Sequence, residues 1–280
     1  MDGSAASREV CSVVRGPARE GGSTLRAGWI ITQRDLLHWV RQPSTPIFGL
    51  LFSLMLLLIF ALLFGGAIGV PGGGDYLGFL VPGMLTMAMM FGVEATTSAM
   101  ARDARKGITD RFRSMPIGSA SVSLGRVGAD MANSVVELVV LIAAGLLIGW
   151  SVDADPGSAV LAVVLLLALR FAVLWVGIFL GLSFRGEGAT TAVQVLVWPF
   201  GFLSAAIIPV ETMPDWLGAV AAWNPISATA TAVRQLLGNP TGFSEGPLVD
   251  GAVLLAVGWP LLITAIFLPL SSHAYRKLRR

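Results

Sequence analysis

The sequence is poor in the residues from which most enzyme sites are built. Its 280 residues include one cysteine and two histidines, and only 13% of them are charged. A single cysteine, Cys11, excludes a disulfide within the chain, and no cluster of His and Cys has the spacing of a metal site. The GxxxxGK[ST], HExxH and GxSxG patterns are also missing. We therefore expect a chain with no catalytic residues and no metal site, which does not itself hydrolyse ATP.

The shortage of charge also excludes an ordinary soluble globule. Soluble domains carry about 25% charged residues, which cover their surface, whereas this chain is 55% hydrophobic. Several runs stay apolar for about 20 residues, the length at which a helix crosses a ~30 Å hydrocarbon core. These features predict an all-α polytopic protein of the cell (plasma) membrane; a large soluble protein with buried helices is the minor alternative.

Six apolar stretches predict six transmembrane helices within a single transmembrane domain, residues 43–280. The predicted spans are about 47–69, 76–100, 124–150, 158–184, 189–209 and 248–272. Residues 1–22 have the composition of a disordered tail, and because no apolar run precedes Ile47 we expect this tail to stay in the cytoplasm. Residues 23–42 have the pattern of an amphipathic interfacial helix, either on the membrane or packed on the protein's own cytoplasmic face.

The basic residues orient these spans. With the N-terminus inside, 17 of the 19 Lys and Arg residues fall in cytoplasmic segments, which satisfies the positive-inside rule with both termini in the cytoplasm. The two exceptions are Arg170, inside the fourth span, and Arg234, in the long outer segment 210–247. Four prolines interrupt that segment, so we expect short helices at the outer surface or dipping into it.

A strongly basic connector, residues 102–126, lies between the second and third spans. Ile108, Phe112 and Met115 share one helical face, charged residues occupy the other faces, and Pro116 ends the pattern. We interpret residues 103–115 as a cytoplasmic surface helix that contacts a partner. Binding to anionic lipid is the alternative interpretation of its arginines.

Two ionisable residues lie at the centres of neighbouring antiparallel spans. Glu137 and Arg170 should therefore have similar depths, and an unpaired charge there is costly. We predict an ion pair between them, which either only fixes the helix register or also belongs to a substrate path. The second span is rich in methionine, which suits an adaptable pathway but also ordinary packing.

Two stretches of the sequence resemble a known family. The first is VEATTSAMARDARKGITDRFRSMPIGSASVSLGRVGADM, with its core at 106–116, and the second is IPVETMPDWLGAVAAWNPISATATAVRQLLG, at 208–238. Both resemble the permease subunits of ABC-2 type exporters, in particular the daunorubicin/doxorubicin-resistance branch of actinobacteria. The resemblance covers roughly residues 25–278.

This resemblance implies an ABC-2 (type V exporter-like) permease fold and several partners. The implied assembly pairs this chain with a second permease, a copy or a paralogue, and with two separately encoded ABC ATPase subunits that bind ATP and Mg. The connector would then be the coupling helix seated on the ATPase. The implied coupling residues are Asp103, Arg105, Lys106, Asp110, Arg111, Phe112, Arg113, Met115 and Pro116.

The resemblance also implies a pathway lined by the second and fifth spans and closed by the outer segment. The lining residues we expect are Met87, Met90 and Gln194. The expected outer gate consists of Pro209, Glu211, Pro214, Asn224 and Pro225.

The expected function is therefore that of a permease subunit of an ATP-driven exporter for an amphipathic drug or lipid-like compound. Export of a glycan or glycolipid is one alternative, and a membrane scaffold or sensor without transport is another. Neither nucleic acid nor a cofactor on this chain is expected.

Overall fold

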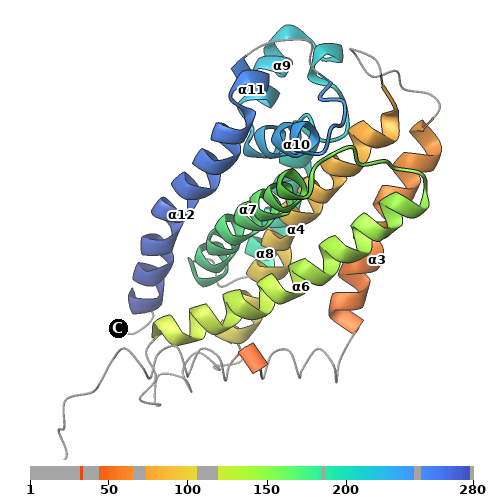
Figure 1. The fold of residues 1–280 in the computed structure, drawn as a ribbon. Helices are drawn as coiled ribbons and strands as arrows, with labels where there is room; N and C mark the ends of the chain where they lie inside the picture. The colour runs from red at the N-terminus through yellow and green to blue at the C-terminus, as the bar shows by residue number, and fades with distance from the viewer. Residues whose placement is uncertain are drawn as a thin grey trace, which may run out of the picture.

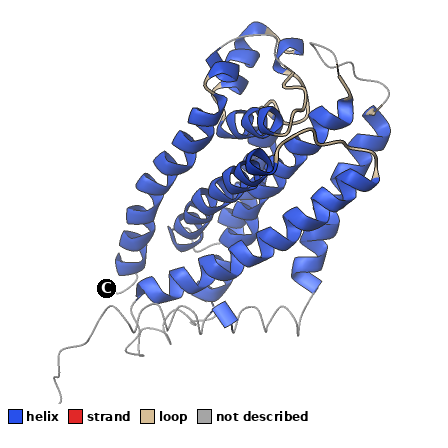
Figure 2. Cartoon of the chain, viewed as in Figure 1, coloured by secondary structure: helices blue, strands red, loops and turns tan. Residues whose placement is uncertain are grey.

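The computed structural model describes residues 32–33, 44–65, 74–105, 119–183, 187–242 and 247–277. In these residues every regular element is a helix (Figure 2). The tail 1–22 and most of the predicted interfacial helix 23–42 lie outside the described ranges. Residues 106–118 of the connector also lie outside the described ranges. Residues 32 and 33 are helical.

Five described helices are long and apolar enough to cross a membrane. They run side by side through the molecule; the first and third of them run in one chain direction, and the second, fourth and fifth run in the opposite direction (Figure 1). The five are α3 (Ser44–Phe64), α4 (Tyr76–Arg105), α6 (Ser119–Leu147), α7 (Pro156–Ser183) and α12 (Ala252–Lys277). The predicted spans 47–69, 76–100, 124–150, 158–184 and 248–272 each correspond to one of them. Because apolar runs of this length satisfy their backbone groups only as helices in lipid, composition alone located them.

The six-span count is not confirmed, because the predicted fifth span, 189–209, is a shorter helix. This helix, α8 (Glu187–Phe202), has 16 residues, or about 24 Å of length at 1.5 Å per residue. Residues 203–209 then form turns instead of continuing the helix. The apolar run misled the prediction because hydropathy does not show where a chain bends.

Beyond α8 the chain folds into a compact segment that we call the cap, residues 203–242. It contains the 3₁₀ turn η1 (Val210–Thr212), α9 (Asp215–Ala222) and α10 (Pro225–Leu236). The short helix α11 (Pro247–Asp250) then leads into α12. The cap lies at the upper end of the bundle in Figure 1. We call the opposite end, where α4 ends at Arg105, the basic end.

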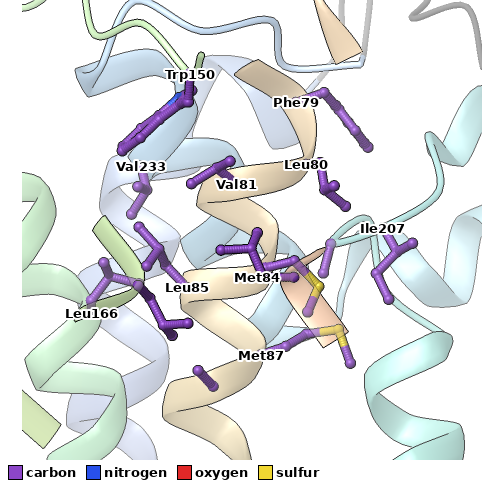
Figure 3. Packing of buried hydrophobic residues seen from close by; sticks show 14 of the residues in the cluster. Phe79, Leu80, Val81, Met84, Leu85, Met87, Trp150, Leu166, Ile207 and Val233 are labelled. Carbon is purple, nitrogen blue, oxygen red and sulfur yellow. The ribbon is translucent and has the colours of Figure 1, made fainter. Parts of the chain in front are cut away.

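Helix α4 is the centre of the bundle. Within an 18-residue apolar stretch of each helix, 83% of the residues are buried in α4, compared with 50% in α7 and 17% in α3. The largest apolar cluster forms around it, and Figure 3 shows Leu80, Met84 and Met87 within that cluster. The helix packs against α3, α6, α7, α8 and α10, so a movement of α4 affects every one of them.

The packing of α4 against α7 depends on small residues. At Gly181 of α7 an added Cβ would lie 2.6 Å from Cβ of Met100 and 2.8 Å from the carbonyl oxygen of Thr97. Both atoms belong to α4. In lipid, where apolar burial gives little drive for helix association, such close approach supplies the packing energy.

We expect Gly181→Val to separate α4 from α7, because the added side chain meets backbone atoms that cannot rotate away. The free energy of unfolding should fall by about 1–3 kcal/mol, as in other overpacked cores. Gly258→Val in α12 is the matched control, since its added Cβ has no neighbour within 4 Å. The stability of both variants is measured by the midpoint of thermal unfolding of the purified protein in detergent. Equal midpoints would show that this contact is not tight.

Candidate functional site

The cap is joined to the bundle by Arg234 of α10, whose side chain is fully buried. Its guanidinium donates hydrogen bonds to three backbone carbonyls. Nε reaches the carbonyl of Phe79 at 2.9 Å, Nη1 that of Ala205 at 2.8 Å, and Nη2 that of Ala206 at 2.8 Å. In addition, Cζ lies 3.6 Å from the centre of the Phe79 ring, a cation–π distance. We call this arrangement the Arg234 cluster.

The Arg234 cluster joins three parts of the chain that are distant in sequence. Phe79 lies on α4, Ala205 and Ala206 lie in the turns after α8, and Arg234 itself lies on α10. Gly83 of α4 makes this contact possible, because an added Cβ there would lie 1.8 Å from the Ala206 carbonyl oxygen. The α4 backbone therefore meets the cap backbone directly.

Asn224 connects the cap to the end of α8. Its side-chain oxygen accepts a hydrogen bond from the amide of Ile226 and so caps α10. Its amide nitrogen donates to the carbonyls of Phe200 and Leu203, both at 2.9 Å. Pro225 follows at the first helical position, where its missing N–H costs nothing. The predicted gate residues Asn224 and Pro225 thus fix α10 to α8.

The other predicted gate residues lie around η1, where Pro209 is buried. The carbonyl of Pro209 accepts hydrogen bonds from the amide and the hydroxyl of Thr212. Glu211 and Pro214 are exposed, and Pro214 precedes α9 as its N-cap residue. These three residues shape the turns of the cap, and whether they form a gate remains a prediction.

Glu137 and Arg170 are both buried, but the predicted direct ion pair does not form. Glu137 accepts a hydrogen bond from Ser53 of α3 at 2.7 Å. Nη1 of Arg170 donates to the carbonyl of Met89 at 3.3 Å. Among the described residues the only salt bridge within 4.0 Å joins Arg126 and Asp130, so Arg170 acts on Glu137 only as a more distant charge.

Glu137 and Arg170 do not meet because their side chains leave their helices in different directions. Sequence spacing gives the depth of a residue in a span, and Glu137 and Arg170 were placed at similar depths on that basis. It does not give the direction in which the side chain leaves the helix. Glu137 faces Ser53 of α3, whereas Arg170 lies over Gly92 of α4, where only the absence of a side chain leaves room for it.

The three predicted lining residues have different environments. Met87 is 1% exposed and belongs to the central apolar cluster (Figure 3), so within this chain it packs in the core. Met90 is partly buried beside that cluster. Gln194 of α8 is exposed. Of the three, Gln194 is the one that reaches an open surface in the single chain.

The predicted coupling residues lie mostly outside the described ranges. Asp103 and Arg105 form the end of α4, so this helix continues beyond the predicted boundary at 100. The remaining predicted coupling residues, Lys106 to Pro116, are not described. Nine residues before the end of α4, Thr96 donates a hydrogen bond to Asp130 of α6 at 3.0 Å, and Asp130 also accepts one from Arg126 at 3.4 Å. The two helices that flank the connector are therefore linked.

Comparison with known proteins identifies the family. The family model of the ABC-2 type transporter matches residues 26–237, which include α4, the connector, α8 and the Arg234 cluster. The chain belongs to the ABC-2 type transporter family. It is thus a multi-pass membrane permease, as the sequence resemblance predicted.

Named relatives agree with this assignment. The chain is 31% identical over 272 residues to the daunorubicin resistance ABC transporter permease protein DrrB1 of Streptomyces coeruleorubidus, which covers 96% of this chain and 92% of the relative. It is 22% identical to the probable doxorubicin resistance ABC transporter permease protein DrrC of Mycobacterium tuberculosis, over 81% of this chain and 86% of that one. It is 25% identical to the probable multidrug ABC transporter permease YbhR of Escherichia coli, over 74% of this chain and 53% of that one.

Sequence reasoning missed the structural role of Arg234. It recognised the residue only as a basic residue in an outer segment and as part of a family pattern. One signal was available: a lone arginine among alanines, valines and threonines in a segment with very little other charge. A buried cation needs acceptors, and α10 has no acidic residue to supply them.

We expect removal of the Arg234 guanidinium to loosen the cap. Arg234→Met should lower the free energy of unfolding by about 1–3 kcal/mol for each buried carbonyl left without a partner. Arg234→Lys should not restore it, because a single ammonium cannot match a planar group that reaches three acceptors. The midpoint of thermal unfolding in detergent measures this loss of stability.

Arg126→Met is the control for charge removal, because it deletes one partly exposed ion pair of small energetic value. If Arg234→Lys and Arg234→Met both melted like the unmodified protein, the Arg234 cluster would not be what holds the cap.

Proposed function

We propose that this chain is the membrane-spanning subunit of an ATP-driven exporter that moves an amphipathic drug or lipid-like compound out of the cell. The observation that carries the proposal is the continuity of α4. This single helix of 30 residues begins beside the Arg234 cluster and ends at the connector. One element thus links the segment proposed to meet the ATPase with the segment proposed to form the gate.

In this proposal, energy enters through the connector at 103–116. Two ABC ATPase subunits, each binding ATP and Mg, close on nucleotide and move the connectors of two permeases, which are copies or paralogues. The displacement passes along α4, because a packed helix moves as a rigid body. At the far end, the Arg234 cluster transfers it to the cap, which opens or closes the outer exit.

The proposed direction of transport depends on the basic end being cytoplasmic. Arg102 and Arg105 lie there at the end of α4, and Arg276 and Lys277 lie there at the end of α12. The excess of basic residues at one end supports this orientation through the positive-inside rule. The names of the relatives, which refer to daunorubicin, doxorubicin and multiple drugs, support the substrate class.

One observation favours a second candidate, export of a glycolipid. Aromatic rings from α3, α4 and α8 gather in one cluster: Phe52, Phe91, Trp198 and Phe202. Aromatic faces bind sugar rings as well as drug rings. A transport assay in vesicles containing the permease and its ATPase separates the two candidates, if fluorescent cationic amphipaths and fluorescent glycolipids are supplied in parallel.

We expect Phe112→Asp to leave the permease inserted in the membrane but to weaken its capture of the ATPase at least about tenfold, because a charge replaces the central apolar contact of the proposed docking face. Co-purification of the ATPase with a tagged permease, followed by ATP hydrolysis in proteoliposomes, measures the loss.

Phe112→Leu is the matched variant, since it keeps an apolar side chain at the same position and should retain most of the binding. Normal assembly and transport by Phe112→Asp would exclude the connector as the site of coupling. Failure of the unmodified permease to retain any ATPase would favour the scaffold or sensor alternative.

A further inference from the structure

Glu94 of α4 is a membrane-embedded carboxylate whose hydrogen-bonding capacity is not used within the part of the chain that the structure describes. Its Oε1 is buried and has no hydrogen-bond partner. None of the described cations lies within 4.0 Å of it. The residue lies eleven positions before the end of α4, or about 16 Å from it. At this depth an ionisable group is costly and is rarely retained without a function.

The direction of Glu94 follows from its neighbours on the helix. Gly92 and Thr96 both face α7, where Arg170 lies over the first and Gly177 against the second. Residues two positions apart in a helix point about 200° away from each other. Glu94 therefore points away from α7, and Arg170 lies on the other side of α4.

The side of α4 that Glu94 occupies is lined by the aromatic cluster. Phe91, one turn before Glu94, has its ring 4.8 Å from Trp198 of α8 and 6.3 Å from Phe52 of α3. Position 91 thus lies between α3 and α8. Because residues three apart share a helical face, Glu94 lies on the same side, one turn closer to the basic end.

Helix α8 contributes the opposite side of this region. It runs antiparallel to α4, so Gln194, one turn before Trp198, lies at about the same level as Glu94. Gln194 is exposed, and 37% of the Phe52 surface and 43% of the Phe202 surface are also exposed. The region between α3 and α8 therefore combines exposed and half-buried rings, one exposed amide and the partly buried carboxylate of Glu94. We call it the α3–α8 face.

We propose that the α3–α8 face binds the cargo, and that its ligand is a cationic amphipath whose charged group meets Glu94 while its apolar rings contact Phe91 and Trp198. The chemistry is complementary in two ways. A carboxylate with no basic neighbour among the described residues attracts a cation, and ring faces attract the same charge through their quadrupole. The proposal rests on the proposed export function and defines its substrate class more narrowly.

Neutral sugars fit this face less well. They would need several hydrogen-bonding groups around the rings, and the side chains identified here provide only Glu94 and Gln194. Glu94 lies on the basic-end side of the middle of α4, a depth that suits a ligand entering from the inner leaflet with its charge toward the cytoplasm. A permanent cation with apolar rings is therefore the appropriate probe.

The test measures binding of tetraphenylphosphonium and of neutral triphenylphosphine oxide to the full permease–ATPase complex in lipid nanodiscs. Glu94→Gln should weaken binding of the cation about tenfold or more, the usual loss when a hydrogen bond or contact to a charged group is removed. Binding of the neutral compound should stay within about twofold. Trp198→Leu should weaken both, because each ligand loses its ring contact.

Asp250→Asn, an exposed carboxylate near the cap, is the control for loss of negative charge and should change neither affinity. Glu94→Asp keeps the charge and should therefore retain part of the cation binding. If Glu94→Gln assembles poorly, the cation affinity of Glu94→Asp still tests the role of the carboxylate. Equal cation affinity in Glu94→Gln and the unmodified complex overturns the proposal. So does preferential binding of a neutral glycolipid.

A failure of this proposal is distinguishable from a failure of the export function. The same preparations report ATPase retention and ATP-driven transport. If transport persists but cation binding does not depend on Glu94, only the assignment of the α3–α8 face is wrong. If no ATPase is retained by the unmodified chain, the export function itself is wrong.

Discussion

The Arg234 cluster is the constraint on which the cap depends. A buried arginine cannot lose its proton at any physiological pH, so its charge must be met by the protein. Here three main-chain carbonyls and one aromatic ring meet it. A buried carboxylate partner would have needed compensation of its own, whereas carbonyls are already present wherever a helix or turn leaves them free. These contacts fix the backbone of α4 to the backbone of the cap, so the two have little freedom to slide past each other.

This constraint makes α4 the mechanical centre of the molecule. Its cap end is held by the Arg234 cluster, and its second half is packed against α7 through small residues and linked to α6 through the Thr96–Asp130 hydrogen bond. A helix held at one end and along its second half cannot bend locally without breaking several contacts. Motion applied at one end is therefore expected at the other, which is the property that the proposed coupling requires.

The sequence predicted the elements whose determinants are local and missed those that depend on the arrangement of distant segments. Apolar length located α3, α4, α6, α7 and α12, because each must satisfy its own backbone in lipid. The same rule extended α8 too far, since the turn at 203–209 is set by Asn224 and Arg234, which lie later in the chain.

The candidate site shows the same division. Charge counting predicted the connector, most of which lies outside the described residues, and family resemblance singled out Asn224 and Pro225, whose role as a gate stays a prediction. The pairing of Glu137 with Arg170 was wrong because depth follows from residue number, whereas rotational position depends on which neighbouring helix is closest. Ser53 of α3, the partner that Glu137 contacts, has no distinguishing pattern in the sequence.

The intramembrane charges then divide by location. Arg234, Arg170 and Glu137 are all enclosed, and each contacts a carbonyl or hydroxyl of another segment. Such groups stabilise one arrangement of helices, because moving any of them would expose an uncompensated charge to an apolar interior. Glu94 differs in position, since it points away from α7 toward the aromatic rings between α3 and α8, and its Oε1 has no hydrogen-bond partner. A charge that no contact within the described chain uses is available to a ligand. For that reason the α3–α8 face, and not the better-satisfied polar core, is the place where a transported compound has something to bind.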